Sequence, residues 1–154
     1  MALETYRKKR KFKETPEPEG KVAKTGKKIF VIQKHAARSL HYDFRLEVAG
    51  VLKSWAVPKG IPKKGEKHLA VETEDHPIEY VKFKGIIPEG NYGAGKVIIW
   101  DKGKFENLSE LSLKDSYKKG HIKINLKGKK AKGEYDIIHT KFGRNEKNWL
   151  LIKK

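Results

Sequence analysis

A succession of eight short β-forming runs, separated by turn residues, is the feature that most constrains the fold. Gly, Pro and Asp residues stand between the runs, as in Ala49-Gly50 and Pro88-Glu89-Gly90. Strands this short and this closely spaced are typical of a barrel or sandwich rather than of alternating strands and helices. We therefore expect an all-β fold, a small closed or partly closed β-barrel. Its strands should cover residues 29–33, 41–48, 53–57, 68–73, 96–100, 121–127, 133–140 and 149–152.

Two segments depart from this strand pattern. Residues 109–119 predict a short helix, which ends at Gly120 because glycine readily adopts the left-handed conformation that closes helices. Residues 1–27 form a basic, proline-containing N-terminal arm, whose prolines disfavour regular structure. The 154 residues therefore predict an arm (1–27) and one barrel domain (28–154), with one or two short helices.

Composition excludes several classes of site. The chain has no cysteine, so it cannot form disulfides, zinc–thiolate sites or iron–sulfur clusters, and a metal must be held by His and carboxylate groups. No apolar run is long enough to cross a bilayer, and the N-terminus lacks the apolar segment of a signal peptide. We expect a cytoplasmic protein without a membrane partner, and a monomer because no exposed apolar stripe is visible.

The formal net charge of +17 is concentrated at the two ends of the chain. Residues 1–28 hold ten Lys and Arg against four acidic residues, and residues 118–154 hold twelve against three. Such an excess favours a polyanionic partner, with nucleic acid ahead of a membrane surface. The alternative is that lysine serves solubility, which the 31 Lys against 5 Arg also fit.

One strand carries a row of chemically active side chains. His41, Asp43 and Arg45 alternate with apolar residues, so they share the face of the strand opposite the core. The turn before this strand can bring His35 beside His41. Two histidines and one carboxylate around one point suit Mn²⁺, Fe²⁺ or Zn²⁺ with positions left open for substrate. The alternative is a set of ordinary surface residues.

Cationic side chains near this row could hold a phosphate. Arg45 beside a bound cation would bind an anion through two parallel N–H donors. The alternative is that Arg45 only forms an ion pair with Glu47 or Asp43. Lys59 follows an apolar strand and could reach the same anion, unless it is a solvated turn lysine.

Acidic residues surround His76, which precedes a proline. Glu74 and Asp75 should raise its pKa and make it a general acid or a phosphate donor; the alternative is an exposed loop histidine. Strict strand alternation puts Glu72 and Glu74 on the same face as His68, where they could support the site or contact substrate.

A glycine-rich stretch at residues 90–96 matches part of a nucleotide-binding P-loop. Val97 stands where the P-loop needs Ser or Thr, and a strand rather than a helix follows. We therefore expect a turn before a strand, and no ATP site.

Several blocks in one order carry a family resemblance. They are Arg10 with residues 15–18, then 30–35, 41–46, 53–60, 74–77 with Tyr80, 88–95 and Trp100-Asp101. Together they resemble the 3′-phosphoesterase domain of bacterial DNA ligase D, over nearly the whole chain from Tyr6 to residues 149–152.

The resemblance implies a small Mn²⁺-dependent β-barrel enzyme, with Zn²⁺ or Co²⁺ as other possible metals, from a bacterium or archaeon. Its substrates would be the 3′ ends of DNA or DNA/RNA primer–templates. It would remove a 3′-terminal ribonucleoside in a phosphodiesterase step and then the exposed 3′-phosphate, leaving a 3′-OH during break repair. A separate ATP-dependent DNA ligase and a polymerase would be its partners.

The resemblance also implies a role for each matching residue. His35, His41 and Asp43 would bind the metal. The phosphate would be contacted, or its site supported, by Arg45, His76, Lys59 and Tyr80, with Gln33 close by. Arg10, Glu17 and Glu74 would help to bind the 3′ nucleoside, which would bring the arm near the active site.

The chain departs from the family pattern at two positions. Lys11 stands where the family has an acid, which bears on the ribonucleoside step. His68 stands where bacterial members often have arginine, and it can donate to phosphate when protonated.

Two other functions fit parts of the sequence. A non-catalytic nucleic-acid-binding barrel would stack bases on Tyr42, Trp55 or Trp100. A metal phosphodiesterase acting on small nucleotides is the third hypothesis. A non-catalytic binding barrel can be distinguished from an enzyme by one cluster of residues, because a binding module does not need it. This cluster comprises His35, His41, Asp43 and Arg45.

Overall fold

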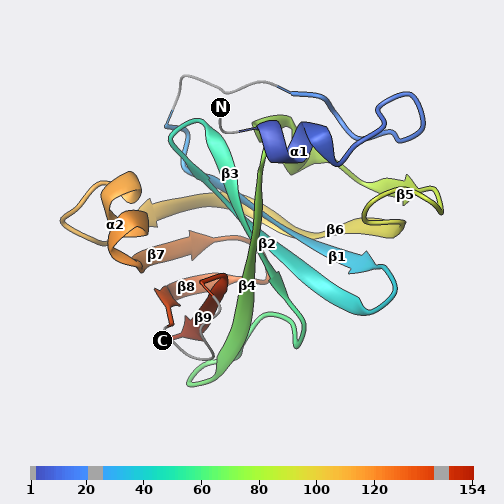
Figure 1. The fold of residues 1–154 in the computed structure, drawn as a ribbon. Coiled ribbons are helices and arrows are strands. Elements are labelled where there is room, and N and C mark those ends of the chain that lie inside the picture. Colours follow the sequence, from blue (N-terminus) through green and yellow to red (C-terminus); the bar gives the residue numbers. More distant parts are fainter. Residues whose placement is uncertain (1–2, 21–25, 141–145) are drawn as a thin grey trace.

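The computed structural model describes residues 3–20, 26–140 and 146–154 (Figure 1). Two short α-helices lie in this part of the chain, α1 (Glu4–Lys8) and α2 (Leu113–Lys119), together with the 3-10 helix η1 (Ile78–Lys82). The strands are β1 (Ile29–Ala36), β2 (Leu40–Val48), β3 (Val51–Val57), β4 (Lys67–His76), β5 (Gly85–Ile87), β6 (Gly95–Asn107), β7 (His121–Lys127), β8 (Lys132–His139) and β9 (Asn148–Lys153). No described helix is long and apolar enough to cross a membrane.

Eight of the strands form a closed antiparallel barrel. They follow one another in the order β1-β2-β3-β4-β9-β8-β7-β6, and β6 pairs back with β1 to close the ring. The short strand β5 pairs with the beginning of β6 outside this ring. The structure therefore confirms the predicted all-β barrel, and each predicted strand corresponds to an observed one.

Apolar residues gather in two clusters on opposite faces of β1. Phe30 and Ile32 belong to the large cluster inside the barrel, where Trp55 is fully buried. Val31, whose side chain points the other way, belongs to a second cluster on the outer wall. That cluster is completed by residues of the arm, η1 and β5, such as Tyr6, Tyr80, Phe83 and Ile87.

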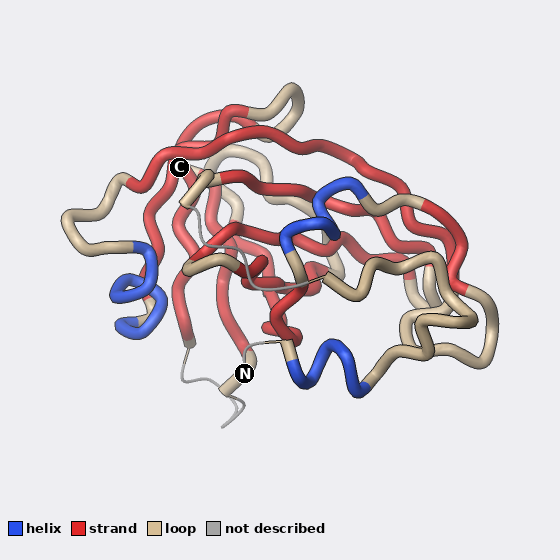
Figure 2. Tube along the Cα trace, turned by 90° about the horizontal axis from the view of Figure 1, so that it is seen from above, coloured by secondary structure: helices blue, strands red, loops and turns tan. Residues whose placement is uncertain are grey.

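The N-terminal arm, η1 and β5 thus form a second layer on one part of the barrel wall. In the view from above, α2 lies well apart from α1 and η1 (Figure 2). The family resemblance predicted an arm near the active site, but a layer that the arm forms together with η1 and β5 was not predicted from the sequence. The arm prolines do keep residues 16–18 irregular, but a helical turn, α1, precedes them.

The predicted helix at residues 109–119 is shorter than expected. It begins after Ser112, whose side-chain oxygen accepts a hydrogen bond from the Asp115 backbone N–H at 3.1 Å, and it closes at Gly120 with φ +80°. The preceding residues form a turn instead, because the Asn107 side chain donates to the Leu111 carbonyl and accepts from the Ser109 N–H. Local side-chain hydrogen bonds thus compete successfully with the first turn of the helix.

A register shift in β4 changes which of its side chains face outward. Ser54 pairs with Thr73, whereas Leu52, two residues earlier on β3, pairs with His76 three residues later on β4. This bulge lets both Thr73 and His76 face the outer wall.

Candidate active site

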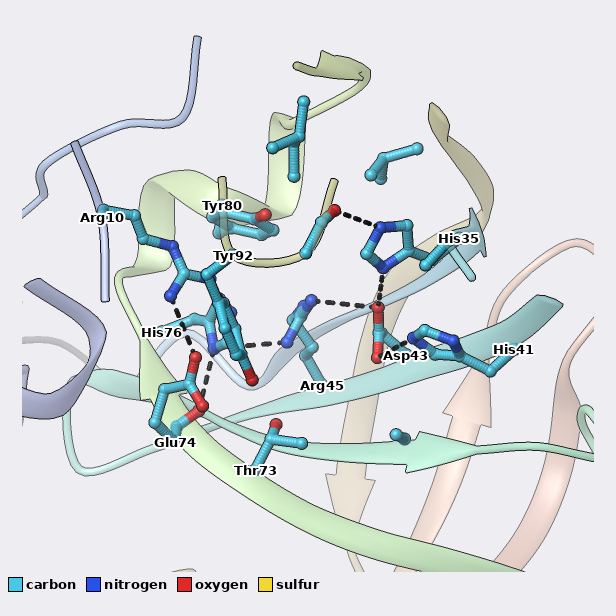
Figure 3. Close-up of a pocket in the computed structure, with 15 residues that line it drawn as sticks. Arg10, His35, His41, Asp43, Arg45, Thr73, Glu74, His76, Tyr80 and Tyr92 are labelled. Carbon is cyan, nitrogen blue, oxygen red and sulfur yellow. Dashed lines mark hydrogen bonds and ion pairs between the residues drawn. The ribbon is translucent and has the colours of Figure 1, made fainter. Parts of the chain in front are cut away.

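A cavity of about 310 Å³ lies on the outer wall of the barrel, under the second layer. Residues of the barrel wall and of the second layer line this cavity, and Figure 3 shows their polar side chains converging on the same space. The titratable and polar residues of the lining are Arg10, His35, His41, Asp43, Arg45, Thr73, Glu74, His76, Tyr80 and Tyr92. The site is therefore separate from the apolar interior that holds the barrel together.

The β1–β2 hairpin brings His35, His41 and Asp43 together. His35 pairs directly with His41 in the strand register, and Asp43 follows two residues later on the same face. Asp43 Oδ2 lies 3.4 Å from His35 Nδ1, and Asp43 Oδ1 lies 3.3 Å from His41 Nε2. One ligand atom from each residue lies within 4.8 Å of the others, which is a suitable arrangement for a single metal ion.

The remaining imidazole nitrogens fix the tautomers that a metal requires. His35 Nε2 donates to the Gly93 carbonyl at 2.7 Å, and His41 Nδ1 donates to the Ser39 carbonyl at 3.0 Å. The two nitrogens that face Asp43 then carry lone pairs. Lone pairs beside a carboxylate repel it unless a cation or a proton lies between them, so this donor set fits a divalent metal.

The ionisation of the cluster follows from its charges. Burial alone raises the pKa of the Asp43 carboxyl, but Arg45 and the two histidines together hold that pKa well below its usual range. When His41 is protonated, its Nε2–H donates to Asp43, and this hydrogen bond raises the pKa of His41. The carboxylate is thus ionised at neutral pH and ready to bind a cation.

Arg45 lies next to the cluster, and its guanidinium is held by hydrogen bonds and an ion pair. Its Nε donates to Gln33 Oε1 at 2.7 Å, and its Nη2 lies 3.4 Å from Asp43 Oδ2. Gln33 is itself oriented, because its amide nitrogen donates to the backbone carbonyls of Tyr80 and Phe83. Gln33 therefore positions Arg45 and does not line the cavity.

His76 is buried between two guanidinium groups. Its Nδ1 lies 3.3 Å from Arg45 Nη1, and its Nε2 lies 3.3 Å from Arg10 Nη2. Burial, and then Arg45 and Arg10, lower the pKa of His76 well below its ordinary value. The predicted rise in its pKa is therefore wrong. The neighbouring acids face other cations: Glu74 pairs with Lys9 and Arg10, and Asp75 pairs with Lys53.

The burial of neutral His76 predicts a pH dependence of stability. Its pKa is lower in the folded state than in the unfolded state, where it is about 6.5. Its contribution to stability is therefore present above that pH and lost as the pH falls below it, by up to about 1.4 kcal/mol per pH unit. We expect His76→Gln to make the free energy of unfolding less steep between pH 6.5 and 5. Urea denaturation in EDTA measures how the free energy of unfolding changes with pH in the wild type and in His76→Gln. Equal pH dependences in the two proteins would contradict a neutral His76.

The arm contributes a buried ionic network to the rim of the cavity. Arg10 Nε lies 3.0 Å from Glu17 Oε2, and Arg10 Nη1 lies 3.0 Å from Glu74 Oε1. The Tyr80 hydroxyl donates to the same Glu17 oxygen at 2.6 Å. The Arg10 guanidinium also lies over the Tyr6 ring, 4.2 Å from its centroid. Arg10 and Glu74 thus face the cavity, whereas Glu17 lies behind Arg10 and Tyr80.

Two predicted site residues do not reach the cavity. Lys59 is exposed in the turn after β3. The His68 ring lies against that turn, with Nδ1 2.6 Å from the Gly60 carbonyl and Nε2 3.7 Å from Glu66 Oε1. We therefore leave both residues out of the phosphate site. Glu72 also points elsewhere, to the Tyr117 hydroxyl and Trp149 Nε1.

The aromatic residues proposed for base stacking lie mainly in the barrel interior. Trp55 is completely buried, so it cannot stack on a base. Tyr42 and Trp100 pack edge to face against each other and against the interior cluster. Thr73 and Tyr92 line the cavity as well, although no site role was predicted for either from the sequence. An aromatic residue among the glycines of residues 90–95 was the available signal for Tyr92.

Comparison with known proteins agrees with this geometry. Residues 33–139 match the DNA Ligase D 3′-phosphoesterase domain. The chain belongs to this family. The matched segment holds the whole His35, His41 and Asp43 cluster with Arg45 and His76, and leaves Arg10 and Glu17 outside it.

Curated relatives of the family are much longer than this chain. It is 45% identical over 155 residues to the multifunctional non-homologous end joining protein LigD of Pseudomonas aeruginosa, covering 98% of this chain and 18% of the relative. It is 51% identical to the protein of the same name from Mycolicibacterium smegmatis, over 96% of this chain and 20% of that protein. The multifunctional non-homologous end joining DNA repair protein LigD of Mycobacterium tuberculosis is 47% identical to this chain. The match covers 96% of this chain and 19% of that protein. The chain thus spans about a fifth of the length of these relatives.

Proposed function

We propose that this chain is a metal-dependent phosphoesterase that repairs the 3′ ends of DNA or DNA/RNA strands during end joining. It removes 3′-phosphates and 3′-terminal ribonucleosides and leaves a 3′-OH. The observation that carries this proposal is the cluster of His35, His41 and Asp43 beside the Arg45 guanidinium in one cavity. Membership of a phosphoesterase family supports the class of reaction.

The metal would be held by His35 Nδ1, His41 Nε2 and an oxygen of Asp43, with Mn²⁺ preferred over Zn²⁺ and Co²⁺. When bound, such a cation acts as a Lewis acid on a phosphate oxygen. The protein supplies the rest of the charge compensation. The Arg45 guanidinium has five N–H donors, and those not engaged by Gln33 and Asp43 can bind the phosphate.

Neutral His76 acts as a positioning residue in this proposal. Its Nδ1 lies 2.8 Å from the Glu74 carbonyl, so that nitrogen carries the proton, and Nε2 accepts from Arg10. The ring therefore holds Arg10 next to Arg45. A phosphate oxygen between the two guanidinium groups gains two cationic donors that are already oriented.

The arm would bind the nucleoside attached to the phosphate. Arg10 and Glu74 offer a donor and an acceptor at the rim, which suits ribose hydroxyls, and Glu17 holds Arg10 in place. Lys11 does not face the cavity, since its side chain is 68% exposed and pairs with Glu14. We propose that the arm (1–27) works as one unit with the barrel (28–154); residues 1–2 and 21–25 of the arm lie outside the described part of the chain. The 3′-OH product then suits a DNA ligase and a polymerase.

The proposal is tested with a 5′-labelled primer–template that ends in a 3′-phosphate or in one 3′-terminal ribonucleotide. Metal-stripped protein is incubated with Mn²⁺ or with EDTA. We expect conversion to a 3′-OH with Mn²⁺ and none with EDTA. Tight binding without conversion in Mn²⁺, Zn²⁺ or Co²⁺ would instead indicate a non-catalytic nucleic-acid-binding barrel.

The basic arm predicts a salt-dependent affinity for nucleic acid. Lys8, Lys11 and Lys13 are exposed and lie close in sequence to Arg10 at the rim. We expect their joint replacement by Gln to raise KM and to reduce the slope of log KM against log salt, by about 1 for each lysine that binds a phosphate. Joint replacement of the exposed Lys63 and Lys64, in the loop between β3 and β4 and outside both basic ends, provides the comparison. An unchanged slope in the arm variant would indicate that these lysines serve solubility.

A further inference from the structure

A second cavity adjoins the phosphate site and shares part of its lining. Its volume is about 520 Å³, and Thr73, Glu74 and Tyr92 line both cavities. The second cavity is otherwise lined by Thr5, Lys9, Val71, Glu72, Glu146 and Lys147. Tyr92 therefore stands at the boundary between the two spaces.

The Tyr92 ring is exposed although it is aromatic. Its exposed fraction is 46%, and it belongs to neither apolar cluster. Lys9 Nζ lies 4.6 Å and Arg10 Cζ lies 5.1 Å from the ring centroid. An accessible aromatic ring with cations beside it is the combination that binds unpaired bases of nucleic acid. In Figure 3 the ring is drawn between Arg10 and Arg45.

Backbone contacts tie this ring to the metal cluster. The carbonyl of the next residue, Gly93, accepts the hydrogen bond from His35 Nε2. The Asn91 N–H donates to the Pro88 carbonyl, and the Ala94 N–H donates to the Asn91 carbonyl, so the loop is held as consecutive turns. Tyr92 is thus presented at a fixed place relative to the reacting phosphate.

We propose that Tyr92 stacks on the base of the 3′-terminal nucleoside and that the second cavity receives this base. The inference rests on the proposed function. A phosphate beside Asp43 and Arg45 directs its nucleoside towards Arg10 and Glu74, and Tyr92 is the accessible aromatic side chain of the cavity lining at that rim. Stacking accepts any base, because every base has a π face. Tyr92 therefore increases the preference for ends that carry a terminal nucleoside without selecting its base.

The test compares wild type, Tyr92→Phe and Tyr92→Leu on three 5′-labelled primer–templates. The primers end in a ribonucleotide, in the same ribose without its base, or in a 3′-phosphate. We expect Tyr92→Leu to lower kcat/KM about tenfold on the ribonucleotide end. On the other two ends its effect should be less than about threefold, and Tyr92→Phe should behave like wild type throughout. Thermal melting of each variant checks the fold.

Binding keeps the inference testable if the ribonucleotide is not removed. Fluorescence anisotropy in EDTA should then show weaker binding of the ribonucleotide end, but not of the base-free end, by Tyr92→Leu. Failure of the wild type on all three ends, with this binding difference intact, would refute the proposed activity alone. The role of Tyr92 would be overturned if Tyr92→Leu lowered kcat/KM equally on all three ends. It would also be overturned if this variant lost neither kcat/KM nor affinity on the ribonucleotide end.

Discussion

Replacement of Asp43 by Ala should lower the rate of 3′-phosphate removal by about a thousandfold or more, while the protein stays folded. Asp43 is the carboxylate between His35 and His41, so its loss removes the charged ligand of the cluster. The barrel interior is not affected, because the cluster lies on the outer wall. His41→Ala should have the same effect on the rate for the same reason.

The measurement combines turnover of a 3′-phosphate primer with calorimetric titration of Mn²⁺. The matched control is Asp136→Asn, which disrupts another His–Asp pair, with His121, at 2.9 Å on β7 and β8. That pair is not part of the His35, His41 and Asp43 group, so the control should keep both activity and metal affinity. Activity that survives in Asp43→Ala and His41→Ala would refute the assignment of the metal ligands.

Replacement of Arg45 by Met should lower kcat by about a hundredfold to a thousandfold, with a much smaller change in metal affinity. Methionine keeps much of the side-chain length but removes every donor to the phosphate. Arg45→Lys should restore only part of the rate, because an ammonium group cannot contact Gln33, Asp43 and a phosphate at once with a planar fork.

The control for losing a paired cation is Lys53→Met, which breaks the ion pair of this partly buried lysine with Asp75 and leaves the cavity lining unchanged. Single-turnover kinetics at saturating Mn²⁺ separate the chemical step from metal binding. If Arg45→Met turned over like Lys53→Met, the guanidinium would have only a structural role.

Local patterns in the sequence predicted the barrel, from short runs separated by turn residues, and the grouping of His35, His41 and Asp43, from alternation along a strand and the turn before it. The spacing of His35, His41 and Asp43 places them on one face of a hairpin, and β1 and β2 form that hairpin. The helix end at Gly120 was predictable for a similar reason, since it depends on one residue. These features need no knowledge of distant contacts.

The remainder of the site depends on contacts between distant segments. The pKa of His76 depends on Arg10 and Arg45, which reach it from the arm and from β2, so its sequence neighbours gave the wrong sign. The β4 bulge turns Thr73 and His76 to the same cavity, which strict alternation along the strand does not predict. The aromatic residue among the glycines of residues 90–95 marks Tyr92 in the sequence, but its place beside the site follows from the distant contact between the Gly93 carbonyl and His35.

The hairpin that carries the proposed metal ligands has a consequence for the order of folding. Its contacts are local, and hairpins form within microseconds, whereas closing the ring joins β1 to β6 and β4 to β9 across long stretches of chain. The Arg45–His76 and Arg10–Glu74 contacts need those slower steps. During refolding the chain can therefore offer a cation its three ligands before the phosphate pocket exists.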